Sequence, residues 1–128
     1  MVEEHVKPEY ELSEITSRII AAAIQVHRNL GPGFEEMIYQ RALALELQGQ
    51  SLDFSREVWI DVHYRGMVVG RKRVDFLIEG VMVELKAYAE LQDVHFVQAL
   101  SYLKASGYKI GLLLNFGAPR LEIKRLAN

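Results

Sequence analysis

Several features that would define the chemistry of a protein are missing from this sequence. The chain of 128 residues contains no cysteine, which excludes disulfide bonds, thiolate nucleophiles and zinc fingers. No apolar run reaches the length of a membrane span, and the first residues lack the basic and apolar segments of a signal peptide. We therefore expect a cytoplasmic protein that does not enter a membrane.

A strong excess of charge of one sign is missing as well. The net charge of −2 argues against strong non-specific binding of nucleic acid, although it is compatible with a local basic face. Hydrophobic residues make up 50% of the chain and charged residues 25%, the balance of an ordinary globular domain. We expect residues 1–128 to form one domain, of which residues 1–10 are a flexible N-terminal tail.

The apolar pattern predicts helices first, then strands, then a mixed segment. Apolar residues at helical spacing predict three helices, over residues 11–29, 34–48 and 93–105. Alternating or continuous apolar runs predict five strands, over residues 58–64, 67–78, 81–86, 108–116 and 121–126. The first three strands follow one another through short turns and should form an antiparallel meander. The fold class is therefore α/β, with helices on one or both faces of a sheet.

The two strands that flank Glu79-Gly80 carry the most informative feature. If Glu79-Gly80 is a two-residue hairpin loop, Asp75 lies directly opposite Glu84. Side chains alternate between the faces of a strand, so Asp75, Glu84 and Lys86 should share one face. The residues expected on the other face are all apolar: Val74, Phe76, Ile78, Val81, Val83 and Leu85.

Two carboxylates placed in this way repel each other. Opposed strand residues have Cβ atoms roughly 5 Å apart, where two like charges repel by about 3 kcal/mol at an effective dielectric constant of 20. A divalent cation would neutralise the pair, because hard cations take carboxylate oxygens. The alternative is an exposed sheet face with salt bridges. The in-register acids, the lysine two residues on and the apolar opposite face favour the metal site.

Glu36, in the first turn of the second predicted helix, shares its face with Tyr39, Leu43 and Leu47. This apolar stripe should face the interior, where a glutamate needs a partner such as a metal ion, an arginine or a lysine. The alternative is that Glu36 only complements the helix dipole.

Four further residues could serve the same site. Gln98 and Tyr102 lie four residues apart on the third predicted helix, so they are neighbours on one face and could orient a lysine, a water or a phosphate. A surface glutamine beside a half-buried tyrosine is the alternative. Arg71 and Arg73 share the face of Asp75 and could neutralise substrate phosphates, or could simply pair with the acids.

These residues resemble a known family. An aspartate on one strand followed by Glu-x-Lys on the next is the signature of the PD-(D/E)xK nuclease-like superfamily, and Asp75 and Glu84-Leu85-Lys86 match it. Residues 33–39 read G-x-x-E-x-x-Y, the hallmark of a small bacterial and archaeal group named after that motif. Residues 26–33, 98–102 and 111–117 are similar to that group too, so the resemblance runs from about Leu12 to Leu126. One position departs from the signature, because Val74 stands where proline precedes the aspartate.

The resemblance implies a restriction-endonuclease-like core, in which a central mixed sheet with an antiparallel meander is flanked by helices. It also implies a phosphodiesterase site that depends on Mg²⁺, for which Mn²⁺ can substitute. Asp75 and Glu84 would hold the metal, with Glu36 and the Leu85 carbonyl as further ligands. Lys86 would position or activate water. Gln98 and Tyr102 match the helix that often follows the Glu-x-Lys strand.

Three classes of function stay open at this point. The first is a nuclease acting on DNA or RNA. The second is a catalytically silent module on the same fold that binds nucleic acid or protein, although the presence of Asp75, Glu84 and Lys86 together favours the nuclease. The third is a structural or oligomer-forming domain, and the edge strand at residues 121–126 could pair two copies into a homodimer.

Overall fold

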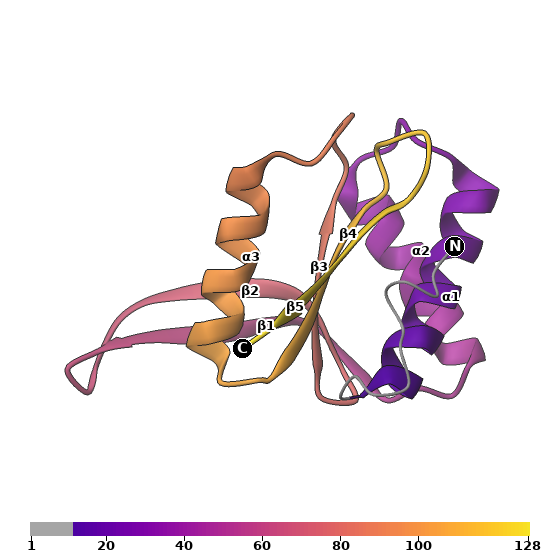
Figure 1. Ribbon diagram of the computed structural model, residues 1–128. Coiled ribbons are helices and arrows are strands. Elements are labelled where there is room, and N and C mark those ends of the chain that lie inside the picture. The colour runs from indigo at the N-terminus through magenta and orange to yellow at the C-terminus, as the bar shows by residue number, and fades with distance from the viewer. Residues whose placement is uncertain (1–11) are drawn as a thin grey trace.

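One mixed β-sheet organises the chain, and helices cover both of its faces (Figure 1). The structure, a computed structural model, describes residues 12–128, and the tail expected over residues 1–10 lies outside the described residues. The helices are α1 (Ser13–Leu30), α2 (Glu36–Gly49) and α3 (Asp93–Ser106). The strands are β1 (Phe54–Tyr64), β2 (Met67–Ile78), β3 (Val81–Lys86), β4 (Ile110–Asn115) and β5 (Glu122–Ala127).

The strands lie in the order β1-β2-β3-β4-β5, which confirms the predicted meander. A crossover through α3 then connects β3 to β4. β3 and β4 are parallel, and the other neighbouring pairs are antiparallel. Two-residue turns close both hairpins of the meander, at Arg65-Gly66 and at Glu79-Gly80. All four of these residues have positive φ, as the tight turns favoured in hairpins require. The α/β class expected from the sequence is confirmed.

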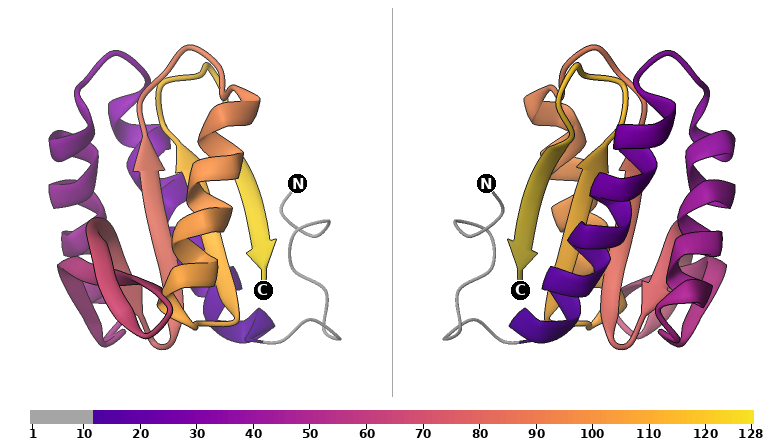
Figure 2. Two further views of the ribbon diagram at one scale, coloured as in Figure 1. Left: turned by 90° about the vertical axis from the view of Figure 1, so that its left-hand side faces the viewer. Right: turned by 90° about the vertical axis from the view of Figure 1, so that its right-hand side faces the viewer.

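The two faces of the sheet bury separate apolar clusters. The larger cluster lies under α1 and α2, and the smaller one lies under α3. The two views of Figure 2 show α3 in front of one face and α1 in front of the other. β3 and β4 are buried from Val81 to Leu85 and from Ile110 to Asn115. Such continuous apolar runs are typical of strands that are covered on both sides.

One prediction about the faces is wrong. Phe76 packs in the larger cluster as expected, but Val74 packs in the smaller cluster, under α3. The pairing of β1 with β2 passes from Arg56–Phe76 to Val58–Val74 without a pair between Glu57 and Asp75, and Glu57 has a φ of 53°. This irregularity breaks the alternation, so the side chains before Asp75 no longer follow the faces set by β3.

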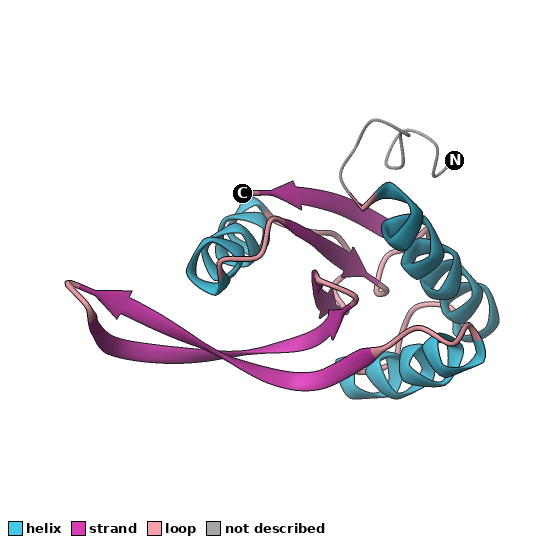
Figure 3. Cartoon of the chain, turned by 90° about the horizontal axis from the view of Figure 1, so that it is seen from below, coloured by secondary structure: helices cyan, strands magenta, loops and turns pink. Residues whose placement is uncertain are grey.

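The distal part of the β1–β2 hairpin, residues 58–73, extends past α3 and is called the arm below (Figure 3). Ile60 packs under α3, but from Tyr64 to Arg73 every side chain is exposed. Among the residues that the structure describes, no helix has both the length and the apolar character needed to cross a membrane.

Candidate active site

Asp75 and Glu84 meet where β2 and β3 stop pairing through their backbones. The backbone register runs from Ile78–Val81 to Phe76–Val83, as the two-residue turn predicts. One residue further, the Asp75 N–H donates to Glu84 Oε1 at 2.9 Å, and the Leu85 N–H donates to Asp75 Oδ2 at 2.8 Å. Each carboxylate therefore binds a backbone donor of the neighbouring strand, and these bonds fix the two acids beside each other.

Burial gives Glu84 an unusual proton affinity. Its side chain is only 6% exposed. Burial, and then the negative charge of Asp75, raise the pKa of Glu84 to about 8, while the Asp75 N–H and the charge of Lys86 act in the opposite direction. In the absence of a cation, this shift favours the protonated form of Glu84. A bound cation would favour the ionised form, so the site is short of positive charge.

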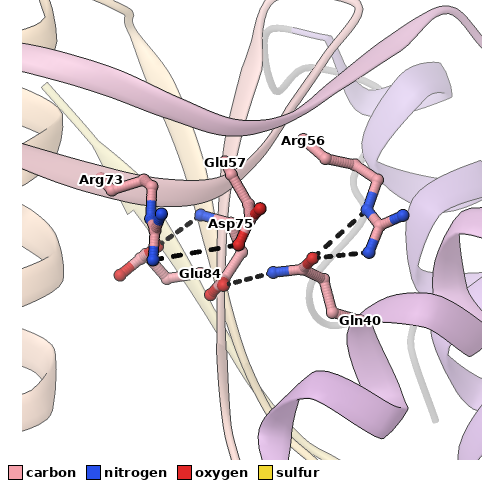
Figure 4. A network of polar contacts seen from close by, with 6 residues as sticks. All are labelled: Gln40, Arg56, Glu57, Arg73, Asp75 and Glu84. Carbon is pink, nitrogen blue, oxygen red and sulfur yellow. Dashed lines mark hydrogen bonds and ion pairs between the residues drawn. The ribbon is translucent and has the colours of Figure 1, made fainter.

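A second layer of contacts holds Asp75 from the side of α2 (Figure 4). Gln40, 3% exposed, donates from Nε2 to Asp75 Oδ1 at 2.9 Å. Its Oε1 accepts from Arg56 Nε at 3.2 Å and from Nη2 at 2.8 Å. The chain Arg56–Gln40–Asp75 thus links β1, α2 and β2. The sequence offered one sign of this role, since Gln40 follows Glu36 by four residues on the same helix face.

Tyr39 fixes the loop that leads into α2. Its hydroxyl donates to the Gly31 carbonyl and accepts the Phe34 N–H at 3.2 Å, and its ring stacks on Phe116 with centroids 4.8 Å apart. Gly33 has a φ of 113°, which favours glycine. The glycine and the tyrosine of the G-x-x-E-x-x-Y segment therefore shape this turn, and they set where Glu36 begins the helix.

Glu36 itself is half-buried at the start of α2. Burial raises the pKa of Glu36, the charge of Lys86 lowers it and that of Asp75 raises it further. Glu36 is thus within electrostatic reach of the residues on β2 and β3, which places it at the edge of the acidic pair. Lys86 is half-buried at the end of β3, where its carbonyl accepts the Phe116 N–H at 2.8 Å.

The donor set suits a hard cation. Asp75 and Glu84 offer carboxylate oxygens, which keep further lone pairs beside the hydrogen bonds described above. Within residues 12–128, no three His, Asp or Glu side chains form a ready-made cluster for a metal ion. Mg²⁺ does not need one, because it keeps several waters and binds through one or two carboxylates together with substrate phosphates. Two fixed acids, with Glu36 nearby, fit that requirement.

The remaining predicted residues come from α3 and from the β1–β2 hairpin. Gln98 is exposed on α3, while Tyr102 packs against the cluster under that helix. Arg71 Nε contacts Asp61 Oδ1 at 3.0 Å, and Arg73 Nη2 lies 3.9 Å from Glu57 Oε2. Their roles in a reaction stay predictions.

A second buried residue near the site lies in the segment 111–117 that resembles the GxxExxY group, but the sequence analysis predicted no role for it. Asn115, with no exposed surface, follows Leu114 at the end of β4. Its side chain accepts the Tyr88 N–H at 2.9 Å, donates to the Tyr88 carbonyl at 2.9 Å and donates to Glu122 at 2.7 Å. Glu122 in turn accepts the Leu91 N–H at 2.9 Å. These bonds tie down the loop that leaves β3 just after Lys86. The only signal in the sequence is an asparagine that directly follows a buried apolar run.

Comparisons with known proteins agree with this architecture. The crystal structure of SSO0001 is similar in fold, with a TM-score of 0.59 and 19% sequence identity. The match covers 99% of the present chain and 59% of that one, so the present chain spans little more than half of its length. No curated protein matches significantly. The family model described as the PD-(D/E)XK nuclease superfamily matches residues 13–126, nearly the whole chain, and the protein therefore belongs to that superfamily.

Proposed function

We propose that this protein is a divalent-metal-dependent nuclease of the GxxExxY group, and that it hydrolyses phosphodiester bonds of DNA or RNA. The observation that carries this proposal is the fixed pair of Asp75 and Glu84, with Lys86 two residues on. Buried, opposed carboxylates raise the pKa of Glu84, a cost that an ordinary structural site would avoid. A cytoplasmic location and a homodimer paired through the β5 edge belong to the same proposal.

In this reaction Asp75 and Glu84 would hold the metal, with Glu36 and the Leu85 carbonyl as further oxygen ligands. Bound there, Mg²⁺ or Mn²⁺ would supply Lewis-acid chemistry toward the scissile phosphate and the attacking water. Lys86 stabilises the negative charge that develops on the phosphate and orients the attacking water. Gln98 and Tyr102 assist from α3, and Arg71 and Arg73 contact phosphates of the substrate.

A second candidate is a catalytically silent binding module. Both oxygens of Asp75 accept protein N–H groups, from Gln40 and from Leu85. Such contacts stabilise the Asp75 carboxylate without a metal. This module would bind nucleic acid or protein and cleave neither.

Calorimetric titration with Mn²⁺ and Mg²⁺ tests the metal site without a choice of substrate. We expect saturable binding to the native protein, and at least about tenfold weaker binding to the Asp75→Asn variant, because ligand loss removes charge from the site. Cleavage of labelled oligonucleotides then tests the activity. We expect Asp75→Ala, Glu84→Ala and Lys86→Ala each to lower the rate by about 100-fold or more.

The matched control is Lys104→Ala, which removes an exposed lysine from α3 and should leave the rate unchanged. Undiminished cleavage in any of the three site variants would contradict the assignment of the site. Absence of metal binding, both alone and with an oligonucleotide present, would favour the silent module.

A further inference from the structure

The arm has a different charge from the rest of the chain. Residues 58–73 carry four basic side chains (Arg65, Arg71, Lys72 and Arg73) and one acidic side chain, Asp61, in a chain whose net charge is −2. All four basic side chains are exposed. A local basic surface of this kind attracts phosphate groups.

The arm also exposes two aromatic side chains beside its arginines. Trp59 is 52% exposed and Tyr64 is 64% exposed, so neither serves mainly to fill a core. The guanidinium carbons of Arg71 and Arg73 lie 4.9 and 5.6 Å from the centroid of the Trp59 ring. That of Arg65 lies 5.7 Å from the centroid of the Tyr64 ring. Exposed rings interleaved with guanidinium groups are typical of surfaces that bind single-stranded nucleic acid.

The acidic partners on the arm do not block this surface. The ion pair of Arg71 with Asp61 has side chains that are 57% and 46% exposed, and the pair of Arg73 with Glu57 is 3.9 Å long. Exposed pairs of this kind contribute little to stability and are screened by salt. A phosphate can therefore replace the carboxylate at either arginine.

The same surface leads toward the acidic pair. Trp59 is paired with Arg73 across the two strands, and alternation places Arg71 on the same face. Figure 4 shows Arg73 paired with Glu57, in the same close-up as Asp75 and Glu84. The opposite face of the arm is covered in part, because Ile60 packs under α3. The exposed face that carries Trp59, Arg71 and Arg73 thus belongs to the hairpin whose second strand, β2, continues into Asp75.

We propose that the arm binds single-stranded nucleic acid, with bases stacked on Trp59 and Tyr64 and phosphates paired with the arginines, and that it leads the strand to Asp75 and Glu84. The guidance to the site rests on the proposed nuclease function, whereas binding to the arm does not. The exposed rings favour a single strand over a duplex, since paired bases do not offer their faces for stacking.

Trp59 is the only tryptophan of the chain, so its fluorescence reports on the arm directly. The 128-residue chain is titrated with an oligothymidylate of about 12 nucleotides, within the site sizes of comparable surfaces, in EDTA so that no cleavage occurs. We expect saturable quenching that weakens as the salt concentration rises. A duplex of the same length should bind more weakly.

Anisotropy of a labelled oligonucleotide then measures the variants. Trp59→Ala should weaken binding by roughly 5- to 150-fold, while Trp59→Phe should retain most of it. Arg71→Ala should reduce the slope of log affinity against log salt by about 0.7. The controls are Leu45→Ala and Arg41→Ala, which remove an exposed apolar and an exposed basic side chain from α2 and should change nothing.

No quenching, or Trp59 and Arg71 variants that behave like their controls, would overturn the inference. Equal or tighter binding of the duplex would show that the arm prefers a duplex, which would also overturn the inference. The experiment also separates the two proposals. Binding of the oligonucleotide without any cleavage after metal is added would contradict the nuclease proposal and support the arm as a binding surface. Cleavage by the native protein, together with unchanged binding by Trp59→Ala, would support the nuclease and contradict the role of the arm.

Discussion

The two halves of the β1–β2–β3 meander are built differently, although they belong to one sheet. In the body, Phe76 and Val83 have no exposed surface and pack under α1 and α2. In the arm, Trp59 and Val69 are 52% and 63% exposed. In the body, the side chains pack into a core that fixes the positions of the strands. The arm keeps its side chains in solvent, where they can meet a ligand.

The proposed site lies at the boundary between these halves. Asp75 is the residue at which β2 passes from the larger cluster, at Phe76, to the cluster under α3, at Val74. The pairing of β1 with β2 is interrupted there as well. A side chain at this point can be fixed by contacts with the body and still be accessible to a substrate bound on the arm. The proposed hydrolytic site requires both.

The largest contrast in stability should follow from truncating one side chain in each half. Phe76→Ala should lower the free energy of unfolding by about 3–5 kcal/mol, because it leaves a cavity in the larger cluster. Val69→Ala, in the arm, should change it by less than about 0.5 kcal/mol. Urea denaturation of both variants measures the two values. Similar losses would mean that the arm is buried in solution against another molecule.

The dependence of stability on pH should distinguish the proposed site from both halves of the meander, with a smaller effect. The pKa of Glu84 is raised from 4.5 to about 8, so between these values the folded protein holds a proton that the unfolded chain has lost. The free energy of unfolding should therefore fall as the pH rises from about 4.5 to about 8, by on the order of a few kcal/mol in total. Glu84→Gln should abolish this fall and make the metal-free protein more stable at high pH.

Urea denaturation in EDTA at several pH values tests this. Glu14→Gln, at an exposed position of α1, is the matched control and should keep the native pH dependence. Mn²⁺ should restore stability to the native protein at high pH, because its ligands must be deprotonated. A Glu84→Gln variant that loses stability with pH as the native protein does would contradict the raised pKa.

The smallest of these effects should come from the second layer around Asp75. Gln40→Ala leaves Asp75 Oδ1 and the Arg56 guanidinium without their shared partner, and should cost about 1–3 kcal/mol in unfolding free energy. Thermal denaturation measures the loss. Gln48→Ala, an exposed position on α2, is the control. Equal melting temperatures for the two variants would show that the contact contributes nothing.

The features that depend on local sequence pattern could be predicted from the sequence alone. The turn at Glu79-Gly80 sets the register, and the register brings Asp75 and Glu84 together. Continuous apolar runs predicted β3 and β4, and helical spacing predicted the inward stripe of Tyr39 and its neighbours. Each of these depends on residues close in the chain, whose geometry is set by the periods of strands and helices.

Other features depend on contacts that no local pattern contains. The face of Val74 could not be predicted, because the irregularity at Glu57 is a property of paired strands and not of either one alone. Gln40 and Asn115 are ordinary polar residues until Asp75 and Tyr88, far along the chain, are placed beside them. The residues that support the site are therefore determined by tertiary packing, whereas the positions of Asp75 and Glu84 follow from the local sequence pattern.

The parallel pairing of β3 with β4 has a consequence for the order of folding. The strand that carries Glu84 and Lys86 closes quickly against β2, through a two-residue turn. The other edge of β3 can pair only after β4 has been added, and β4 follows the loop and α3 in the chain. Pairings between distant segments close slowly, because loop entropy is lost before the contacts are gained. We therefore expect the acidic pair to form early in a hairpin whose other edge is still open, so the nascent chain passes through a state that can add a strand from another molecule.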